Sequence, residues 1–144
     1  TDPSVPGKIR KLPVTQEEIL RFARRRNPFN HPCVMYKKSV VLAAGGYQSF
    51  EGFEDYYLWL RMLSNGARGY NMDRVILFMR TKGMYQRRGG LHYAKNVIRF
   101  RNYMFRNGFC SLQDYLVTVC GHVIVSLMPD KMRKLFYNNV LRRG

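Results

Sequence analysis

Apolar residues recur every three to four positions over several stretches of the chain, which is the spacing of one face of an α-helix. A capping-box pattern, with Thr15 as N-cap and Glu18 three residues on, opens the first of them. We expect this helix to end near Arg26. The same spacing predicts helices over 37–44, 54–63, 91–106, 112–128 and 130–141.

The helix predicted over 54–63 is the most informative. It begins with two adjacent carboxylates, Glu54 and Asp55, and ends at the signal Asn65-Gly66. Asp55 shares a face with the apolar residues Leu58 and Trp59. A carboxylate on an apolar face is paired, caps the helix or takes part in function.

Shorter apolar runs favour strands. Residues 33–36 follow a segment bracketed by prolines, and 70–72 and 74–79 follow the central helix. The run from Val75 to Met79 is continuously apolar, which indicates a strand covered on both faces. Together with the helices, these strands predict an α/β fold with mostly helices around a small mixed sheet.

Composition and charge narrow the function classes. The chain has 144 residues, 46% of them hydrophobic, which suits one modest domain and excludes a disordered tail. Its formal net charge of +16 favours polyanionic partners: nucleic acid, phosphorylated substrates or an anionic membrane.

Three widely spaced cysteines form no C-x-x-C pair, so neither a zinc site nor a disulfide framework is indicated. Free thiols fit a reducing compartment. The opening residues carry no signal peptide and have the look of an internal start, which predicts a fragment of a longer protein.

Three motifs occur in order along the chain: the segment 27–38 (NPFNHPCVMYKK), Gly45-Gly46-Tyr47, and the segment 54–61 (EDYYLWLR). Together they resemble the C-terminal half of family-2 glycosyltransferases with the GT-A fold, and most of all the bacterial enzymes of surface-polysaccharide biosynthesis. The resemblance spans about 17–143. It implies an acceptor-side part of the GT-A domain over 15–108, preceded by a linker or loop over 1–14 and followed by a helical, possibly membrane-associated tail over 109–144.

The resemblance implies an inverting transfer of sugar from a nucleotide-diphosphate donor to a saccharide acceptor, commonly lipid-linked. The second carboxylate of the Glu-Asp motif, Asp55, would be the general base that takes the proton of the acceptor hydroxyl. The alternative is a first-turn acid that only complements the helix N-terminus.

The same resemblance places acceptor contacts at Glu54, Asn30, His31 and Trp59. Three of these residues have a structural alternative. Glu54 could instead pair with Arg61, His31 could be a hydrogen-bonded structural histidine, and Trp59 could be part of the core rather than a platform for a sugar ring.

Arg87 and Arg88 lie in a basic, glycine-containing loop, where related enzymes close over the diphosphate. A solvated charge pair is the alternative. The family's nucleotide and metal contacts cannot be carried over, because no Asp-x-Asp triplet occurs here. A divalent metal, Mg or Mn, is expected in the full-length enzyme with its ligands outside this chain, and the chain alone should be inactive.

The helix predicted over 112–128 is almost uncharged but shorter than the roughly 20 residues that span a bilayer. It is expected to lie on an anionic inner membrane surface, which would place the enzyme peripherally on the cytoplasmic face. The alternative is that it packs on the missing half or on a second copy as a homodimer. The competing functions are a nucleic-acid-binding module, for which no recognised motif appears, and a non-enzymatic membrane-associated module.

Overall fold

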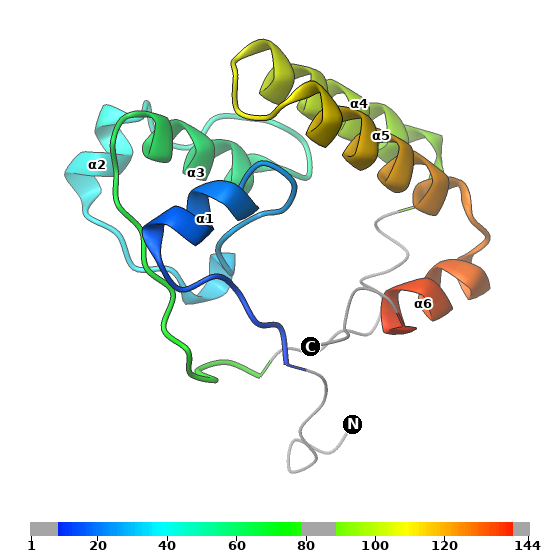
Figure 1. Cartoon of the computed structure of the whole chain (residues 1–144), viewed down its shortest axis with the longest axis horizontal. Coiled ribbons are helices and arrows are strands. Elements are labelled where there is room, and N and C mark those ends of the chain that lie inside the picture. Colours follow the sequence, from blue (N-terminus) through cyan, green and yellow to red (C-terminus); the bar gives the residue numbers. More distant parts are fainter. Residues whose placement is uncertain (1–8, 79–88, 140–144) are drawn as a thin grey trace.

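The structure is a computed structural model, and it describes residues 9–78 and 89–139. Within these residues, six α-helices and one 3-10 turn follow one another (Figure 1). They are α1 (Gln16–Phe22), η1 (His31–Cys33), α2 (Lys38–Ala43), α3 (Glu54–Ser64), α4 (Gly90–Arg106), α5 (Leu112–Leu127) and α6 (Asp130–Asn139).

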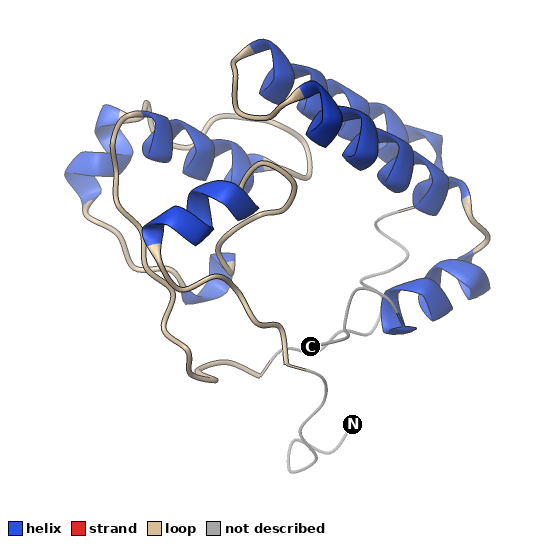
Figure 2. Cartoon of the chain, viewed as in Figure 1, coloured by secondary structure: helices blue, strands red, loops and turns tan. Residues whose placement is uncertain are grey.

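The predicted small sheet is not seen, because the described part of the chain contains no strand (Figure 2). Cys33 ends the 3-10 turn, and Val34 is extended but pairs with no neighbouring strand. The prediction that the run after Arg74 is covered on both faces is also wrong for 75–78, whose side chains are 44–72% exposed. An extended segment becomes a strand only beside a partner, and none of the described residues forms a strand beside these segments.

The helices lie close to their predicted bounds, with one larger difference. The predicted capping box forms at Thr15 for α1, and a second one forms at Ser111 for α5. The first helix ends at Phe22 rather than near Arg26. Residues 23–26 turn away because their carbonyls bond to other helices, as described below, and because Pro28 does not allow the helix to continue.

Helix α3 is the centre of the core and is buried on two opposite sides. One side meets α4: Phe100 is fully buried, stacks on Phe53 with ring centroids 4.5 Å apart and contacts the ring of Tyr56. The other side packs Leu58 and Trp59 against α2. Each large side chain buried in this way stabilises the fold by about 1.5–3 kcal/mol.

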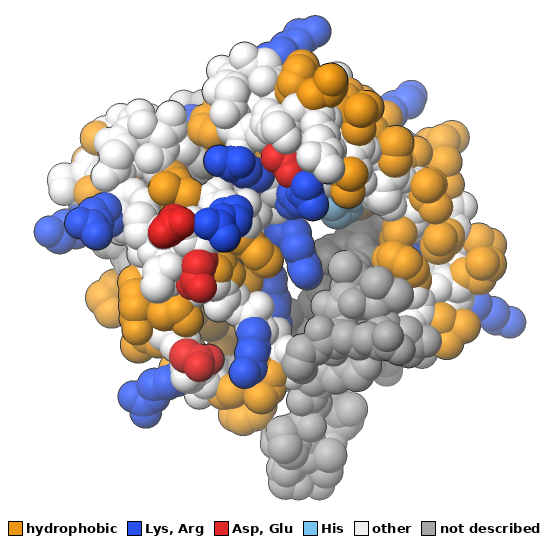
Figure 3. Space-filling view, viewed as in Figure 1, with side chains coloured by type: hydrophobic (Ala, Val, Ile, Leu, Met, Phe, Trp, Pro, Cys, Tyr) orange, Lys and Arg blue, Asp and Glu red, His pale blue; other side chains and the backbone are white. Residues whose placement is uncertain are grey.

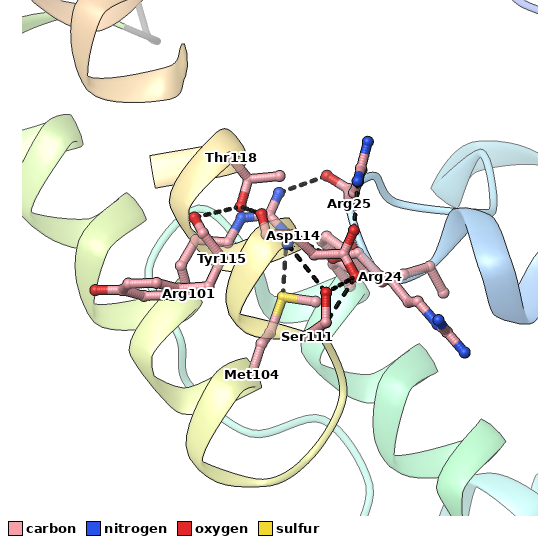
Figure 4. Close-up of polar contacts among 10 residues, drawn as sticks. Arg24, Arg25, Arg101, Met104, Ser111, Asp114, Tyr115 and Thr118 are labelled. Atoms are coloured by element: carbon pink, nitrogen blue, oxygen red, sulfur yellow. Dashed lines mark hydrogen bonds and ion pairs between the residues drawn. The ribbon is translucent and has the colours of Figure 1, made fainter. Parts of the chain in front are cut away.

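Helices α4 and α5 form an antiparallel hairpin, which lies along one side of the molecule in Figure 1. The turn that follows α1 is tied to this hairpin and to α3 (Figure 4). Tyr56 donates to the carbonyl of Ala23, and the buried Arg101 of α4 donates to the carbonyl of Arg25 at 2.6 Å. The Arg25 side chain forms an ion pair with Asp114 of α5. Three helices therefore hold the start of the loop that leads to Asn27.

Within the described residues, no helix combines the length and the apolar character needed to cross a membrane. Helix α5 is the most hydrophobic of them and has 16 residues.

Candidate active site

Asp55 lies in the first turn of α3, half-buried, and belongs to no ion pair among the described residues. Its Oδ2 accepts a hydrogen bond of 2.8 Å from the Asn27 side chain, and its Oδ1 accepts one of 2.7 Å from the backbone N–H of Tyr56. A carboxylate offers about four lone-pair sites, so these two bonds orient the group and leave capacity for a further donor. Within the described residues, the carboxylate is therefore held in place by two neutral donors and has no cationic partner.

The loop carrying Asn27 is itself held firmly. Asn27 Oδ1 accepts from the N–H of Phe29, and Pro28 is fully buried. Asn71 donates to the carbonyl of Pro28 at 3.0 Å, which ties the loop to the segment after α3. The Asn27 amide therefore meets Asp55 from a backbone with little freedom.

Aromatic rings surround Trp59 beside this carboxylate. Its neighbours, with ring centroids 5.8–6.5 Å away, are Phe29, His31, Tyr36 and Tyr47. Trp59 is only 1% exposed, and its indole N–H has no hydrogen-bond partner among the described residues. The ring therefore belongs to the core and presents no open face for a sugar in this structure, while His31 and Tyr47 are exposed at the rim of the cluster.

The pKa of the Tyr47 phenol is shifted by its surroundings, which include Asp55. Its pKa is raised to about 12 by partial burial, by a hydrogen bond with the Tyr36 side chain and by the negative charge of Asp55. Tyr47 is therefore a neutral hydroxyl near the carboxylate at physiological pH. Neutral hydroxyls next to an anionic acceptor are suited to hydrogen-bond a polyhydroxylated ligand.

A two-glycine turn brings Tyr47 to this place. Gly45 and Gly46 end α2 with φ angles of +81° and +65°, a conformation that favours glycine. Arg61 of α3 donates to the carbonyl of Gly46 at 2.7 Å and also to that of Ala44. The guanidinium therefore fixes the turn to α3, the helix that carries Asp55.

The other predicted acceptor contacts differ in their exposure and in their hydrogen bonds. Glu54 is exposed and accepts from the N–H of Gly52 at 3.1 Å. The alternative pair with Arg61 is not formed, since that guanidinium is bound to backbone carbonyls. Asn30 precedes η1 and is half-buried, without a side-chain cap bond, and the exposed His31 is the first residue of η1. Arg87 and Arg88 lie outside the described residues.

Two surface grooves lie among the described residues, and Asp55 lines neither. One, of about 640 Å³, runs along α4, and the other, of about 430 Å³, lies beside Arg61 and Asn65. Across residues 9–78 and 89–139, no three His, Cys, Asp or Glu side chains gather as a metal site would require. Binding of a divalent metal by ligands outside this chain stays a prediction.

Three residues of the site were not predicted as functional: Asn27, Tyr36 and Tyr47. Asn27 lies 28 positions before the carboxylate that it contacts, and helical spacing carries no information over that separation. The available signal was weak: all three residues fall inside the sequence motifs, where Asn27 precedes a proline and Tyr47 follows the paired glycines.

The chain is similar to bacterial glycosyltransferases over nearly its whole length. It is 37% identical over 143 residues to a UDP-Gal:alpha-D-GlcNAc-diphosphoundecaprenol beta-1,3-galactosyltransferase of Escherichia coli, covering 99% of this chain and 52% of that protein. It is 34% identical to an uncharacterised glycosyltransferase of Haemophilus influenzae, with 93% of this chain and 50% of that protein covered. It is also 34% identical to an amylovoran biosynthesis glycosyltransferase of Erwinia amylovora, with 90% and 49% covered.

The chain thus spans about half the length of the curated relatives that it matches. No family model and no solved structure matches it. The relatives confirm the predicted resemblance to glycosyltransferases of polysaccharide biosynthesis and are consistent with a part of such a transferase. The assignments to family 2 and to the GT-A fold stay predictions.

Proposed function

We propose that this chain is the acceptor-side half of an inverting glycosyltransferase in which Asp55 is the general base. The observation that carries the proposal is the state of that carboxylate. It is half-buried, oriented by Asn27 and a backbone N–H, and not neutralised by any cation among the described residues. A merely structural first-turn acid needs neither a dedicated amide partner nor a neighbouring pair of phenols.

The reaction would proceed in one displacement. Asp55 takes the proton of the acceptor hydroxyl while the acceptor oxygen bonds to the anomeric carbon of the donor sugar. The bond from that carbon to the diphosphate oxygen breaks, and the nucleoside diphosphate leaves with the electron pair. Asn27 and the N–H of Tyr56 hold the base in place, which supplies the alignment that makes such a step efficient.

The substrates are proposed from the relatives. UDP-galactose and an N-acetylglucosamine-diphosphoundecaprenol acceptor are the first pair to assay, because the Escherichia coli relative is named for them. In this proposal Asn30, His31 and Tyr47 contact the acceptor, Arg87 and Arg88 contact the diphosphate, and a divalent metal binds on the donor half. The enzyme would work peripherally at the inner face of a membrane, where its lipid-linked acceptor lies, as a monomer or a homodimer.

The test uses the longer transferase that contains this segment. Asp55→Asn is expected to abolish transfer of labelled galactose while the binding of UDP-galactose, measured by calorimetry, stays unchanged. Asp73→Asn is the matched control, since Asp73 is an exposed aspartate outside the site, and it should transfer at the wild-type rate. Undiminished turnover in Asp55→Asn would remove this carboxylate from the mechanism.

A further inference from the structure

Helix α5 carries its polar side chains on the side that faces the protein. Asp114, Thr118, His122 and Ser126 follow one another at intervals of four, three of them buried and His122 half-buried. The Thr118 hydroxyl donates to the carbonyl of Asp114 at 2.7 Å, and the Ser126 hydroxyl donates to that of Val123 at 2.9 Å. These hydroxyls are satisfied inside the helix and need no water.

The outer side of α5 is apolar. Its exposed side chains, apart from Gln113, are Leu112, Leu116, Val117, Cys120, Ile124 and Leu127. The five aliphatic ones are 51–58% exposed, and Met132 and Leu135 of α6 extend the surface. Figure 3 shows this band of hydrophobic side chains along α5 and α6. A helix facing water has the reverse distribution, so α5 is built for an apolar neighbour.

Cations accompany this face. Neighbouring α4 exposes Lys95, Arg99 and Arg106, none of which belongs to an ion pair within the described residues. No aspartate or glutamate occurs between Asp73 and Asp114, and Glu51, which does contact α4, pairs with His92. All three cations line the groove of about 640 Å³ together with Asn102, whose side chain accepts from the Tyr115 hydroxyl of α5 at 2.6 Å. The cationic groove therefore borders the seam between the two helices.

A bilayer surface fits both features. A helix of 16 residues is about 24 Å long, too short for the roughly 30 Å of a hydrocarbon core but suited to lie in its surface. The donor half of the enzyme has a separate place to pack, because the exposed apolar run at 75–78 lies well away from α5 in Figure 1.

We propose that the outer face of α5 docks into the surface of an anionic lipid bilayer, with the α4 cations on the phosphate headgroups. The proposal rests on the proposed function, which it deepens by naming the surface through which the enzyme meets its lipid-linked acceptor.

The first experiment is co-sedimentation of the chain with vesicles of phosphatidylcholine and phosphatidylglycerol. The double variant Leu116→Gln, Ile124→Gln should lower the partition coefficient at least about tenfold, because two apolar side chains no longer enter the bilayer. The matched control is Leu42→Gln, Met72→Gln, which changes two equally exposed apolar residues away from α5 and should bind as wild type. Equal loss in both double variants would overturn the proposal.

The cations are tested in the same assay. Each of Lys95→Gln, Arg99→Gln and Arg106→Gln should lower binding by up to about fivefold, and vesicles of phosphatidylcholine alone should bind the wild type correspondingly less. The control Lys38→Gln removes an exposed cation from α2 and should leave binding unchanged. Binding that is indifferent to lipid charge would refute the role of α4.

Cys120 offers a direct probe, since it is exposed on the proposed docking face. A polarity-sensitive thiol dye on Cys120, in a Cys33→Ser background, should shift to the blue with vesicles and be quenched by brominated lipid. The same dye in a Ser39→Cys variant lacking Cys33 and Cys120 should not respond. A Cys120 dye that does not respond to vesicles would refute the proposal. So would a Cys120 dye that is already shielded from water in the longer transferase without lipid, or a dimer that the α5 substitutions abolish, because either result would show that a protein covers this face.

The two proposals fail separately. Asp55→Asn should bind vesicles as wild type, since Asp55 is not part of the docking face. Vesicle binding without any transferase activity in the longer protein would remove the proposed function and leave the docking surface standing. Transferase activity without vesicle binding would remove the docking surface and leave the proposed function standing.

Discussion

Replacing Asp114 with asparagine removes one charge from a contact that joins the turn after α1 to the first turn of α5. The carboxylate is only 6% exposed and accepts from the N–H of Ser111 at 3.2 Å and from its hydroxyl at 2.7 Å. It also pairs with Arg25. Asparagine keeps the shape and one acceptor oxygen, so the variant isolates the charge.

The expected cost follows from these contacts. Weakening the capping box costs about 1 kcal/mol, and losing a charge-assisted hydrogen bond costs about 1.5–3 kcal/mol. Arg25 is 48% exposed and becomes rehydrated when its partner is lost, so the second figure applies at its lower end. We expect the free energy of unfolding at pH 7 to fall by about 2–3 kcal/mol.

The same variant should change the pH dependence of stability. Hydrogen bonds from Ser111, and then Arg25, hold the pKa of Asp114 below its ordinary range. A depressed folded-state pKa gives a contribution that is complete above the unfolded pKa of about 3.9 and is lost as pH falls through the folded one. The difference between wild type and variant should therefore shrink as the pH falls below about 4.

Urea unfolding followed by Trp59 fluorescence measures both effects, because this buried residue is the single tryptophan of the chain. The control is Glu17→Gln, which breaks the largely exposed Arg21–Glu17 pair and should cost less than about 0.5 kcal/mol. A variant as stable as wild type at pH 7, or a difference that persists undiminished at about pH 3, would refute the reasoning.

Three further predictions concern the site and its supports. Asn27→Ala in the longer transferase should lower kcat about ten- to hundredfold with less effect on KM, because Asp55 loses its orienting amide; steady-state kinetics check this, and an unchanged kcat would contradict it. Gly45→Ala should cost about 1–2 kcal/mol in urea unfolding and exceed Gly46→Ala, since only at Gly45 would a Cβ also approach another side chain, at 2.9 Å. Burial raises the pKa of Tyr56 to about 12, so its contribution to stability should be lost as pH rises from about 10 towards 12, a loss that unfolding at alkaline pH would show reduced in Tyr56→Phe.

The helices were predictable because their signals lie in neighbouring residues. The prediction of the sheet failed because strand pairing has no such local signal. Capping at Thr15 and Ser111 and apolar spacing are properties of neighbouring residues, so the helices they predict form close to the expected bounds. A strand is defined by a partner elsewhere in the chain, and the part of the chain that the structure describes supplies none for the apolar run at 75–78. The apolar composition of 75–78 indicates a segment that could pair as a strand. It does not indicate whether a partner strand is present.

The site was predictable to a similar extent. Helical spacing correctly placed Asp55 on the face of Leu58 and Trp59, because that relation lies within one helix. The amide of Asn27 bonds to Asp55 from another segment, and the phenol of Tyr47 lies near enough for the charge of Asp55 to raise its pKa. Nothing in the local sequence of either residue predicts that proximity. The functional roles of all these residues stay predictions.

The clasp around the turn after α1 has a mechanical consequence. Arg101 and Asp114 hold that turn from the α4–α5 hairpin, and the turn runs on within a few residues into Asn27. A tilt of the hairpin would therefore move the Asn27 amide, which orients the carboxylate of Asp55. In the proposed mechanism, the alignment of the base would therefore depend on the position of the α4–α5 hairpin.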